Sequence, residues 1–121
     1  MKFTLLILLI TSYLFAANQC IKCHGGIEHI REESSGMMKA ILEVADKAGH
    51  RGNDCIVCHG GNPKQKSKKY AHNGTVKYFK KNKGPKEFYP APGSTWINQN
   101  TCGMCHQEQV DAQMNSLMMT E

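Results

Sequence analysis

Cys20-Ile21-Lys22-Cys23-His24 is the first of three copies of one five-residue pattern in this chain of 121 residues. The other two copies are Cys55-Ile56-Val57-Cys58-His59 and Cys102-Gly103-Met104-Cys105-His106. All six cysteines of the chain belong to these copies, so none remains for a separate disulfide framework. The pattern Cys-x-x-Cys-His is the attachment signature of c-type haem. The sequence therefore predicts three covalently bound haems c, each with its iron.

The spacing within each copy has a chemical reason. Two cysteines three positions apart lie on one side of a helical turn, and their thiols can form thioether bonds with the two vinyl groups of a single haem. The histidine directly after the second cysteine can then bind the iron as the proximal ligand. The predicted thioether residues are Cys20, Cys23, Cys55, Cys58, Cys102 and Cys105. The predicted proximal iron ligands are His24, His59 and His106.

Two other kinds of site also use paired cysteines. Structural zinc is often held by two Cys-x-x-Cys units, but such a site needs no histidine directly after each pair. A redox-active dithiol of the thioredoxin type belongs to an alternation of strands and helices, and the sequence lacks that alternation. Both alternatives are weaker than the haem interpretation.

Each haem iron has a second, distal coordination position, and the chain has three histidines outside the motifs. His50 follows the end of a predicted helix, and His72 lies in a loop that could fold over a haem. His29 is close to His24 in sequence and would have to serve a neighbouring haem. A solvated histidine is the alternative in each case. Methionine is the competing distal ligand, although a methionine on an apolar helix face more often fills the core. The methionine candidates are Met37, Met38, Met104, Met114, Met118 and Met119.

The expected fold is mainly α with extensive loops and little or no β-sheet, organised around the three haems. Glycine is abundant, with 11 residues, and no long alternating run of Val, Ile and Thr predicts strands. Ser34 and Ser35 offer an N-cap for a helix over Met37–Ala48, and Gly49 is its predicted stop. The predicted apolar side of this helix comprises Met37, Ile41, Val44, Ala45 and Ala48.

The chain after the second motif is expected to be less regular. The stretch 60–93 is rich in Gly, Pro, Asn and Lys, which predicts an extended loop. Thr101 is expected to cap a last helix that holds the third motif and continues through Val110, Met114 and Leu117. Aromatic residues gather between the second and third motifs, where packing in the core or against haem faces is their expected role. They are Tyr70, Tyr78, Phe79, Phe88, Tyr89 and Trp96.

Residues 1–16 have the pattern of a cleaved signal peptide. Lys2 supplies a positive start, a mostly apolar run leads to Ala16, and Ala16 and Ala17 are small residues suited to cleavage. The apolar run is shorter than the ~20 residues needed to cross a bilayer, although a retained anchor is the alternative. The expected mature domain is therefore residues 17–121, located in the periplasm, with no stable membrane span.

Lysines give the chain much of its formal net charge of +5. Nine of them follow the second motif without an intervening acidic residue. They can offset the charge of haem propionates, or steer an acidic redox partner or a small oxyanion, and a solvated loop is the simpler alternative. Nucleic acid is not an expected partner, because the chain is exported and lacks an interleaved aromatic motif. The nine are Lys64, Lys66, Lys68, Lys69, Lys77, Lys80, Lys81, Lys83 and Lys86.

With its three motifs the chain resembles the multihaem c-type cytochromes. A narrower resemblance rests on residues 55–63, on the helix before them and on the closing residues 115–121. These look similar to the N-terminal part of the octahaem sulfite reductase and hydroxylamine oxidoreductase group. That resemblance implies periplasmic electron transfer during respiration of sulfur or nitrogen oxyanions. It implies no catalytic residue here, because the sequence has no fourth motif and no variant motif ending in Lys.

Two functions follow from this pattern. One is a trihaem carrier that moves electrons between periplasmic redox proteins in anaerobic-type respiration. The other is the N-terminal module through which electrons enter a larger multihaem oxidoreductase acting on sulfite, hydroxylamine or nitrite. The closing residues Leu117, Met118 and Met119 are still apolar and no stop signal precedes them, which leads to the expectation of either a truncated open reading frame or the front of a longer polypeptide. Whether the chain belongs to an enzyme is left open by its sequence.

Overall fold

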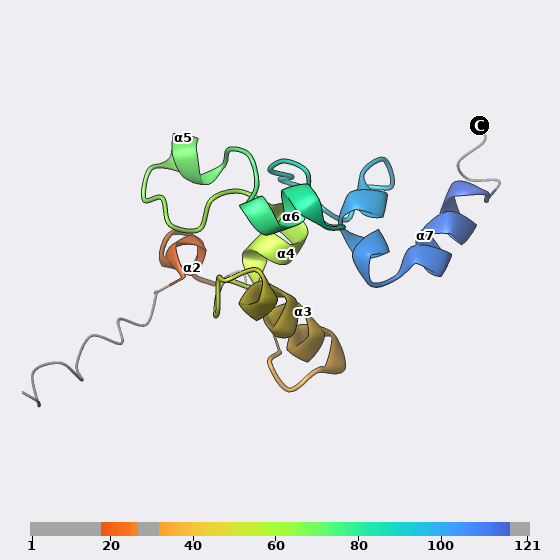
Figure 1. The fold of residues 1–121 in the computed structure, drawn as a ribbon, viewed down its shortest axis with the longest axis horizontal. Helices are drawn as coiled ribbons and strands as arrows, with labels where there is room; N and C mark the ends of the chain where they lie inside the picture. Colours follow the sequence, from red (N-terminus) through yellow and green to blue (C-terminus); the bar gives the residue numbers. More distant parts are fainter. Residues whose placement is uncertain (1–17, 27–31, 117–121) are drawn as a thin grey trace, which may run out of the picture.

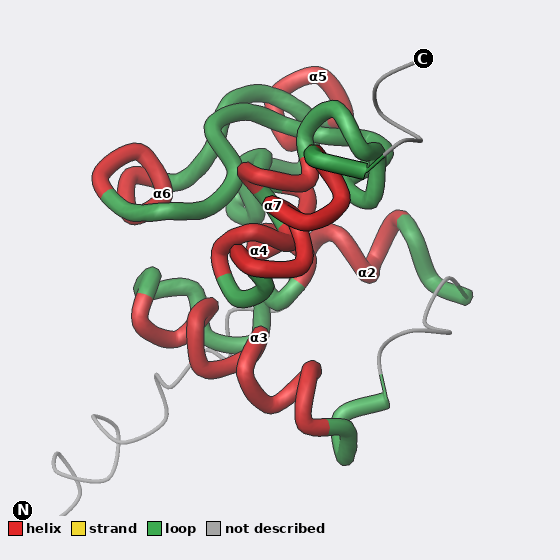
Figure 2. Tube along the Cα trace, turned by 90° about the vertical axis from the view of Figure 1, so that its right-hand side faces the viewer, coloured by secondary structure: helices red, strands yellow, loops and turns green. Residues whose placement is uncertain are grey.

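The structure is a computed structural model that describes residues 18–26 and 32–116. Within these ranges the chain is helical and looped, and no strand is present (Figure 2). This confirms the prediction of a mainly α fold with extensive loops. The predicted signal peptide, His29 and the closing residues from Leu117 onward lie outside the described ranges.

The longest described helix is α3, Gly36–Lys47, and its ends have the predicted signals. The Ser35 hydroxyl oxygen accepts a hydrogen bond from the Met38 amide at 3.1 Å, as an N-cap does. Gly49, with φ of +76°, ends the helix in a conformation that favours glycine. The observed bounds therefore lie within one residue of the predicted helix at each end.

The buried side of α3 is rotated slightly from the predicted one. Met37 was expected on the apolar side but is 51% exposed, whereas Met38 is 2% exposed. The fully buried Ala45 and its neighbours Ile41, Val44 and Ala48 pack into the core, as expected. Successive residues of an α-helix are separated by about 100° around its axis. An error of one position at the edge of the predicted apolar side therefore assigned burial to Met37 instead of Met38.

The hydrophobic core lies where α3 meets α4, Cys55–His59, and α6, Lys77–Lys81. It contains Ala45 from α3, Ile56 and Val57 from α4, Phe79 from α6, and Val76 at the N-cap of α6. Burying such side chains supplies ~1.5–3 kcal/mol each relative to leaving them exposed. In Figure 1, α4 lies in the middle of the molecule, with α2, Gln19–Cys23, toward one end and α7, Gln107–Met114, toward the other.

The stretch 60–93 is not the continuous extended loop that its composition predicted. It contains α5, Lys68–Ala71, and α6, and the ring of Phe79 in α6 is fully buried. In α6 one large apolar side chain, Phe79, anchors an otherwise polar segment, whereas α5 has no buried residue. The average composition of the segment does not reveal the effect of one buried residue such as Phe79.

The last helix also differs from the prediction. The third motif lies in a short 3₁₀ turn, η3, Cys102–Met104, and α7 begins only at Gln107. Thr101 does not cap a helix with its side chain; its hydroxyl donates to the Pro92 carbonyl oxygen at 2.7 Å. Val110 in α7 is buried as expected, whereas Met114 is 41% exposed. Gly103 inside the motif disfavours a continuous α-helix at this point.

Candidate functional site

The first motif occupies α2 and is held against the residues that precede the second motif. Asn18 caps α2, since its side-chain oxygen accepts from the Cys20 amide at 3.0 Å. The Asn18 amide group lies 3.1 Å from the Gly52 carbonyl oxygen, 3.2 Å from the Asp54 carboxylate and 3.8 Å from the Cys55 sulfur. One side chain therefore links the attachment sites of two predicted haems.

The second motif forms α4 in the core of the protein. Its two intervening residues, Ile56 and Val57, are 0% and 2% exposed. Gly60 follows α4 with φ of +68° and ψ of −140°, a conformation open essentially only to glycine. A Cβ atom at Gly60 would overlap the Glu87 carbonyl oxygen and lie 3.2 Å from the Pro85 Cβ. The chain around residue 87 thus closes directly over the end of the motif.

The histidine of the second motif is oriented by a backbone contact. The Nδ1 atom of His59 lies 2.8 Å from the Tyr89 carbonyl oxygen, and the Tyr89 amide donates to the His59 carbonyl oxygen at 2.8 Å. Because a carbonyl oxygen can only accept, this bond requires a proton on Nδ1 and leaves the Nε2 lone pair available. Metal-binding histidines are commonly held in this way, with the second ring nitrogen donating to a carbonyl.

A cavity of about 680 Å³ lies between the first two motifs. This volume is within the range of protein sites for small molecules and cofactors. Its lining includes both cysteines and the histidine of the first motif, together with Cys55 and His59 of the second. The remaining wall comes from the stretch 60–93 and includes Lys66, Lys68, His72, Phe88 and Pro90.

His72 faces the first motif across this cavity. The imidazole rings of His24 and His72 have centroids 5.8 Å apart and planes tilted by 31°. Metal–imidazole bonds of about 2 Å require ring centres about 6 Å apart when two histidines bind one metal from opposite sides. The separation of the two rings is compatible with both imidazoles binding one iron, and Cys20 and Cys23 line the same cavity. Among the candidate distal ligands, His72 is the one whose described contacts place it beside a motif histidine.

Phe88 continues the row of rings toward the second motif. Its ring stacks on His72 with a centroid distance of 4.5 Å and an angle of 10°. Its ring centroid also lies 6.4 Å from that of His59, with an angle of 26° between the planes. Phe88 was expected from the sequence to pack in the core or against a haem face, with no particular partner, and the contact of the Tyr89 carbonyl with His59 was not expected. Neither role has a sequence signature, because both depend on how the loop folds back.

The third motif is the most exposed of the three. Cys102, Cys105 and His106 are exposed, and His106 immediately precedes α7. The His106 amide donates to the Cys102 carbonyl oxygen at 2.8 Å, which keeps the five residues in one turn. Met104, between the two cysteines, packs against the core cluster and anchors the motif. This core contact is typical of a packing methionine.

The thiols differ in acidity because their surroundings differ. A hydrogen bond between the Cys20 and Cys55 thiols lowers the pKa of Cys20 to about 7. The same bond, together with burial, raises the pKa of Cys55. Burial, followed by the nearby Cys102 and Cys105 thiols, raises the pKa of Cys58 to about 11.

His50 lies in the turn between α3 and α4. Its amide donates to the Ala45 carbonyl oxygen at 2.9 Å, and burial, with a smaller effect of Lys64, lowers the pKa of its imidazole. Its described contacts do not link it to a motif, so it stays a candidate distal ligand on sequence grounds. Among the methionine candidates that the structure describes, Met38 is a core residue, whereas Met37 and Met114 are exposed.

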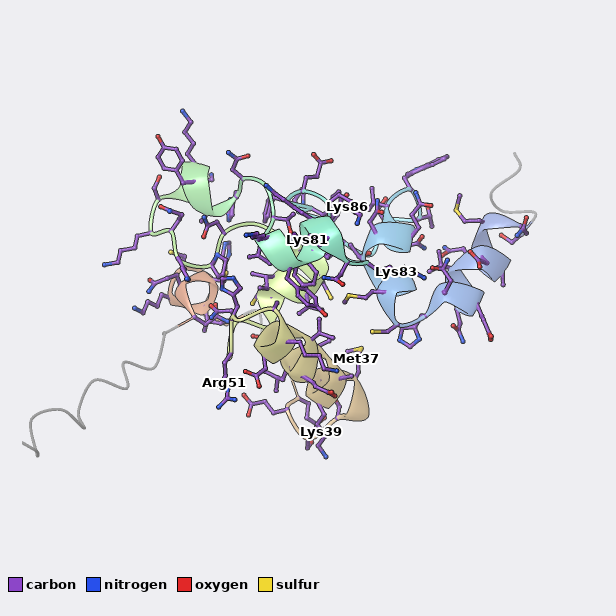
Figure 3. All side chains as sticks on the ribbon, viewed as in Figure 1. Met37, Lys39, Arg51, Lys81, Lys83 and Lys86 are labelled. Carbon is purple, nitrogen blue, oxygen red and sulfur yellow. The ribbon has the colours of Figure 1, made fainter. Side chains whose placement is uncertain are left out.

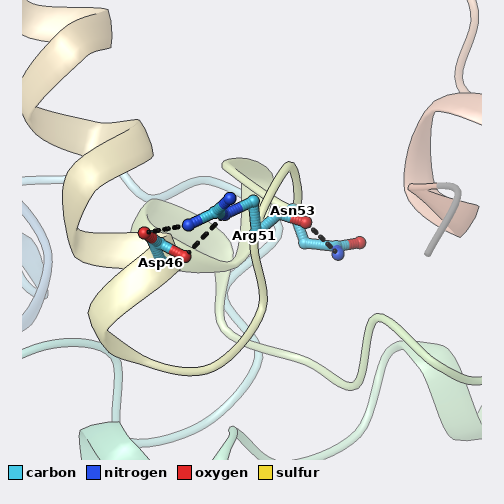
Figure 4. Close-up of polar contacts among 3 residues, drawn as sticks. All are labelled: Asp46, Arg51 and Asn53. Carbon is cyan, nitrogen blue, oxygen red and sulfur yellow. Dashed lines mark hydrogen bonds and ion pairs between the residues drawn. The ribbon is translucent and has the colours of Figure 1, made fainter. Parts of the chain in front are cut away.

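An ion pair holds the turn that leads into the second motif (Figure 4). The Arg51 guanidinium donates to both carboxylate oxygens of Asp46, at 2.9 and 3.0 Å. The Asn53 side chain then donates to the Arg51 carbonyl oxygen at 3.3 Å. The Arg51 hydrogen bonds lower the pKa of the Asp46 carboxyl below its usual value.

The lysines divide into two groups in space. Lys66 and Lys68 line the cavity between the first two motifs, where ammonium groups can pair with carboxylates of a bound group. Lys81, Lys83 and Lys86 lie around and after α6 (Figure 3), and the Lys86 ammonium donates to the Asn82 carbonyl oxygen at 2.9 Å. Two aromatic residues of the surrounding chain are exposed rather than packed: Tyr70 at 57% and Trp96 at 76%.

Comparison of the chain with protein-family models, curated proteins and solved structures finds no match. In the described ranges, no group of three or more His, Cys, Asp and Glu side chains is arranged to hold a metal ion directly. A search of the same residues finds no helix with the length and apolar character needed to span a membrane.

Proposed function

We propose that this chain is an exported c-type cytochrome with three covalently bound haems and that it transfers electrons in the periplasm. The observation that carries this proposal is the cavity between the first two motifs. There a Cys-x-x-Cys-His motif and a histidine distant in sequence line one cavity of about 680 Å³, with the two imidazole rings 5.8 Å apart. That arrangement supports a haem with two axial histidines, a ligation typical of electron transfer.

The residues have separate roles in this proposal. Cys20 and Cys23 attach the first haem, His24 is its proximal ligand, and His72 is its distal ligand. The other cysteine pairs attach the second and third haems, with His59 and His106 as proximal ligands. Each bound haem supplies an iron that can take up and release one electron. With His24 and His72 both bound to it, the iron of the first haem would have no open position for a substrate, which would suit electron transfer.

The lysines support a partner of opposite charge. Lys66 and Lys68, at the cavity, are suited to pair with haem propionates. Lys81 and Lys83 are exposed around α6 and would attract an acidic redox protein. Their effect would be chiefly on the rate of association and would fall as salt is added.

The first experiment is production of the full chain in a periplasm that has the c-type haem attachment system. A haem-stained gel and the intact mass should give three haems per chain. Absence of covalent haem would overturn the proposal. In the native source, a stained product of the size of this chain would indicate a free carrier, and a much larger one would indicate a module of a multihaem oxidoreductase.

The second experiment tests the ligation of the first haem. Replacing His72→Ala should convert one of the three haems from six-coordinate low spin to a form with an open position, visible in the absorption and EPR spectra. Tyr70→Ala is the matched control, because Tyr70 is close in sequence but exposed. An unchanged spectrum in His72→Ala would show that this histidine is not an iron ligand.

A further inference from the structure

The three motifs follow one another along the long axis of the molecule (Figure 1). The first motif, in α2, lies toward one end, and the second, in α4, lies in the middle. The third, in η3, lies on the other side of α4, where the chain leads into α7. The order of the motifs in space is therefore the same as their order in the sequence.

The contacts between the first and second motifs are direct. The Asn18 side chain, which caps α2, reaches the Gly52 carbonyl oxygen, the Asp54 carboxylate and the Cys55 sulfur, at 3.1, 3.2 and 3.8 Å. The two motifs also share one cavity, whose lining includes His24 and His59. Successive ring contacts connect the two motif histidines along that cavity. The centroid distances are 5.8 Å from His24 to His72, 4.5 Å from His72 to Phe88, and 6.4 Å from Phe88 to His59.

The second and third motifs meet at the hydrophobic core. Met104 of the third motif packs against the core cluster to which Ile56 and Val57 of the second motif belong. The middle motif is therefore contacted from both directions along the chain, by Asn18 at Cys55 and by Met104 at the core.

We infer that the second motif holds the middle position of a linear three-haem relay, with Phe88 packed between the distal ligand of the first haem and the proximal ligand of the second. This inference rests on the proposed function and adds an order to it. His59 and its motif then have two redox neighbours, whereas the first and third motifs have one each. A partner would exchange electrons at either end, through the exposed third motif or the cavity mouth at the first.

The physical basis of the test is electrostatic. Adding an electron to one iron changes its charge, and that change shifts the potential of a neighbour more strongly at short distance and low dielectric constant. Adjacent haems therefore titrate with interacting potentials, and their EPR signals differ from the sum of the isolated signals. Haems that lie too far apart for this electrostatic shift titrate with independent potentials.

The experiment removes one end motif at a time from the full chain in its haem-loaded form. One variant carries Cys20→Ser with Cys23→Ser, and the other carries Cys102→Ser with Cys105→Ser. The end motifs are chosen because neither contains a fully buried residue pair like that of α4. Intact mass should first confirm that each variant keeps two haems, and circular dichroism should confirm that its helix content is retained.

Both variants should retain an interacting pair of haems: the second with the third, and the first with the second. Each loss should also shift the potential of the second haem, because in each case it loses a neighbour. An independent pair in either variant would overturn the inferred order while leaving the proposed function intact. Three haems that all titrate independently in the unaltered chain would overturn it as well. A chain without covalent haem would refute the proposed function itself.

Discussion

Replacement of Gly60 with alanine should destabilise the protein and disturb the proposed second haem selectively. Gly60 has φ of +68° and ψ of −140°, and a side chain in such a sparsely populated region costs about 1–3 kcal/mol. In addition, its new Cβ would overlap the Glu87 carbonyl oxygen, which belongs to the backbone and cannot rotate away. The segment from Pro85 to Tyr89 would have to move.

That movement would break the contacts that orient His59. Two hydrogen bonds join His59 and Tyr89, one through the imidazole and one through the backbone. Losing them removes about 1 kcal/mol each. The expected decrease in the free energy of unfolding for Gly60→Ala is therefore about 3–5 kcal/mol, the sum of the backbone strain and these two bonds.

Gly74→Ala is the matched control. Gly74 has the same φ of +68°, but a Cβ there would meet no atom within 4 Å. Only the backbone strain of about 1–3 kcal/mol should apply. Urea unfolding of the haem-loaded protein, followed by circular dichroism, gives the free energy of unfolding. The absorption and EPR spectra report which haem changes.

The free energies of unfolding of the two variants should differ by about 2 kcal/mol. Only Gly60→Ala should change the spectrum, and only at one haem. Equal losses of unfolding free energy in the two variants would contradict this prediction. The backbone near Glu87 would then accommodate a side chain at position 60 at no extra cost. A change at all three haems would also refute the prediction, by showing a general loss of structure.

Three further predictions follow from other contacts. In the haem-free protein, Cys20 should be alkylated faster than Cys58 near neutral pH, because the pKa of Cys20 is lowered to about 7 and that of Cys58 is raised to about 11. Peptide mass mapping measures the two rates, and equal rates would contradict this difference in acidity. The Asp46 carboxyl should titrate below its ordinary range by NMR and return to it in Arg51→Gln. Folding lowers the pKa of Asp46, so the ion pair should add to the free energy of unfolding at pH values above the ordinary pKa of a carboxyl group. This contribution should be lost as the pH falls through the folded-state pKa. Phe88→Leu should keep three haems but alter the EPR signals of the first and second, whereas an unchanged spectrum would mean that the ring has no part in their contact.

The local parts of the fold were predictable from the sequence. The ends of α3 follow from Ser35 and Gly49, because capping depends on residues close to one another in the chain. The absence of strands in the described ranges agrees with the lack of alternating β-branched residues. The three motifs are also local signals, and the structure brings each into a single turn.

The arrangement of those local parts was not predictable. His72 and His24 belong to segments that carry no common periodic pattern, and only the folded loop brings their rings to 5.8 Å. The continuous helix expected at the third motif is interrupted, because packing of Met104 and the Gly103 position decide the local geometry there. Likewise α6 exists because Phe79 is buried in the core, a tertiary effect that overrides the polar composition around it.

The burial of Ile56 and Val57 means that the three motifs are not interchangeable cassettes. Attachment chemistry needs only the two cysteines and the histidine, so the two residues between the cysteines are free to vary as far as the haem is concerned. In α4, however, these positions form the interior, and transplanting the Ile-Lys pair of the first motif would put an ammonium group where Val57 is 2% exposed. An unpaired charge in such a place is strongly unfavourable. The positions between the cysteines can therefore vary in α2, which has no buried residue, but not in α4; in the third motif the buried Gly103 and the core contact of Met104 restrict them as well.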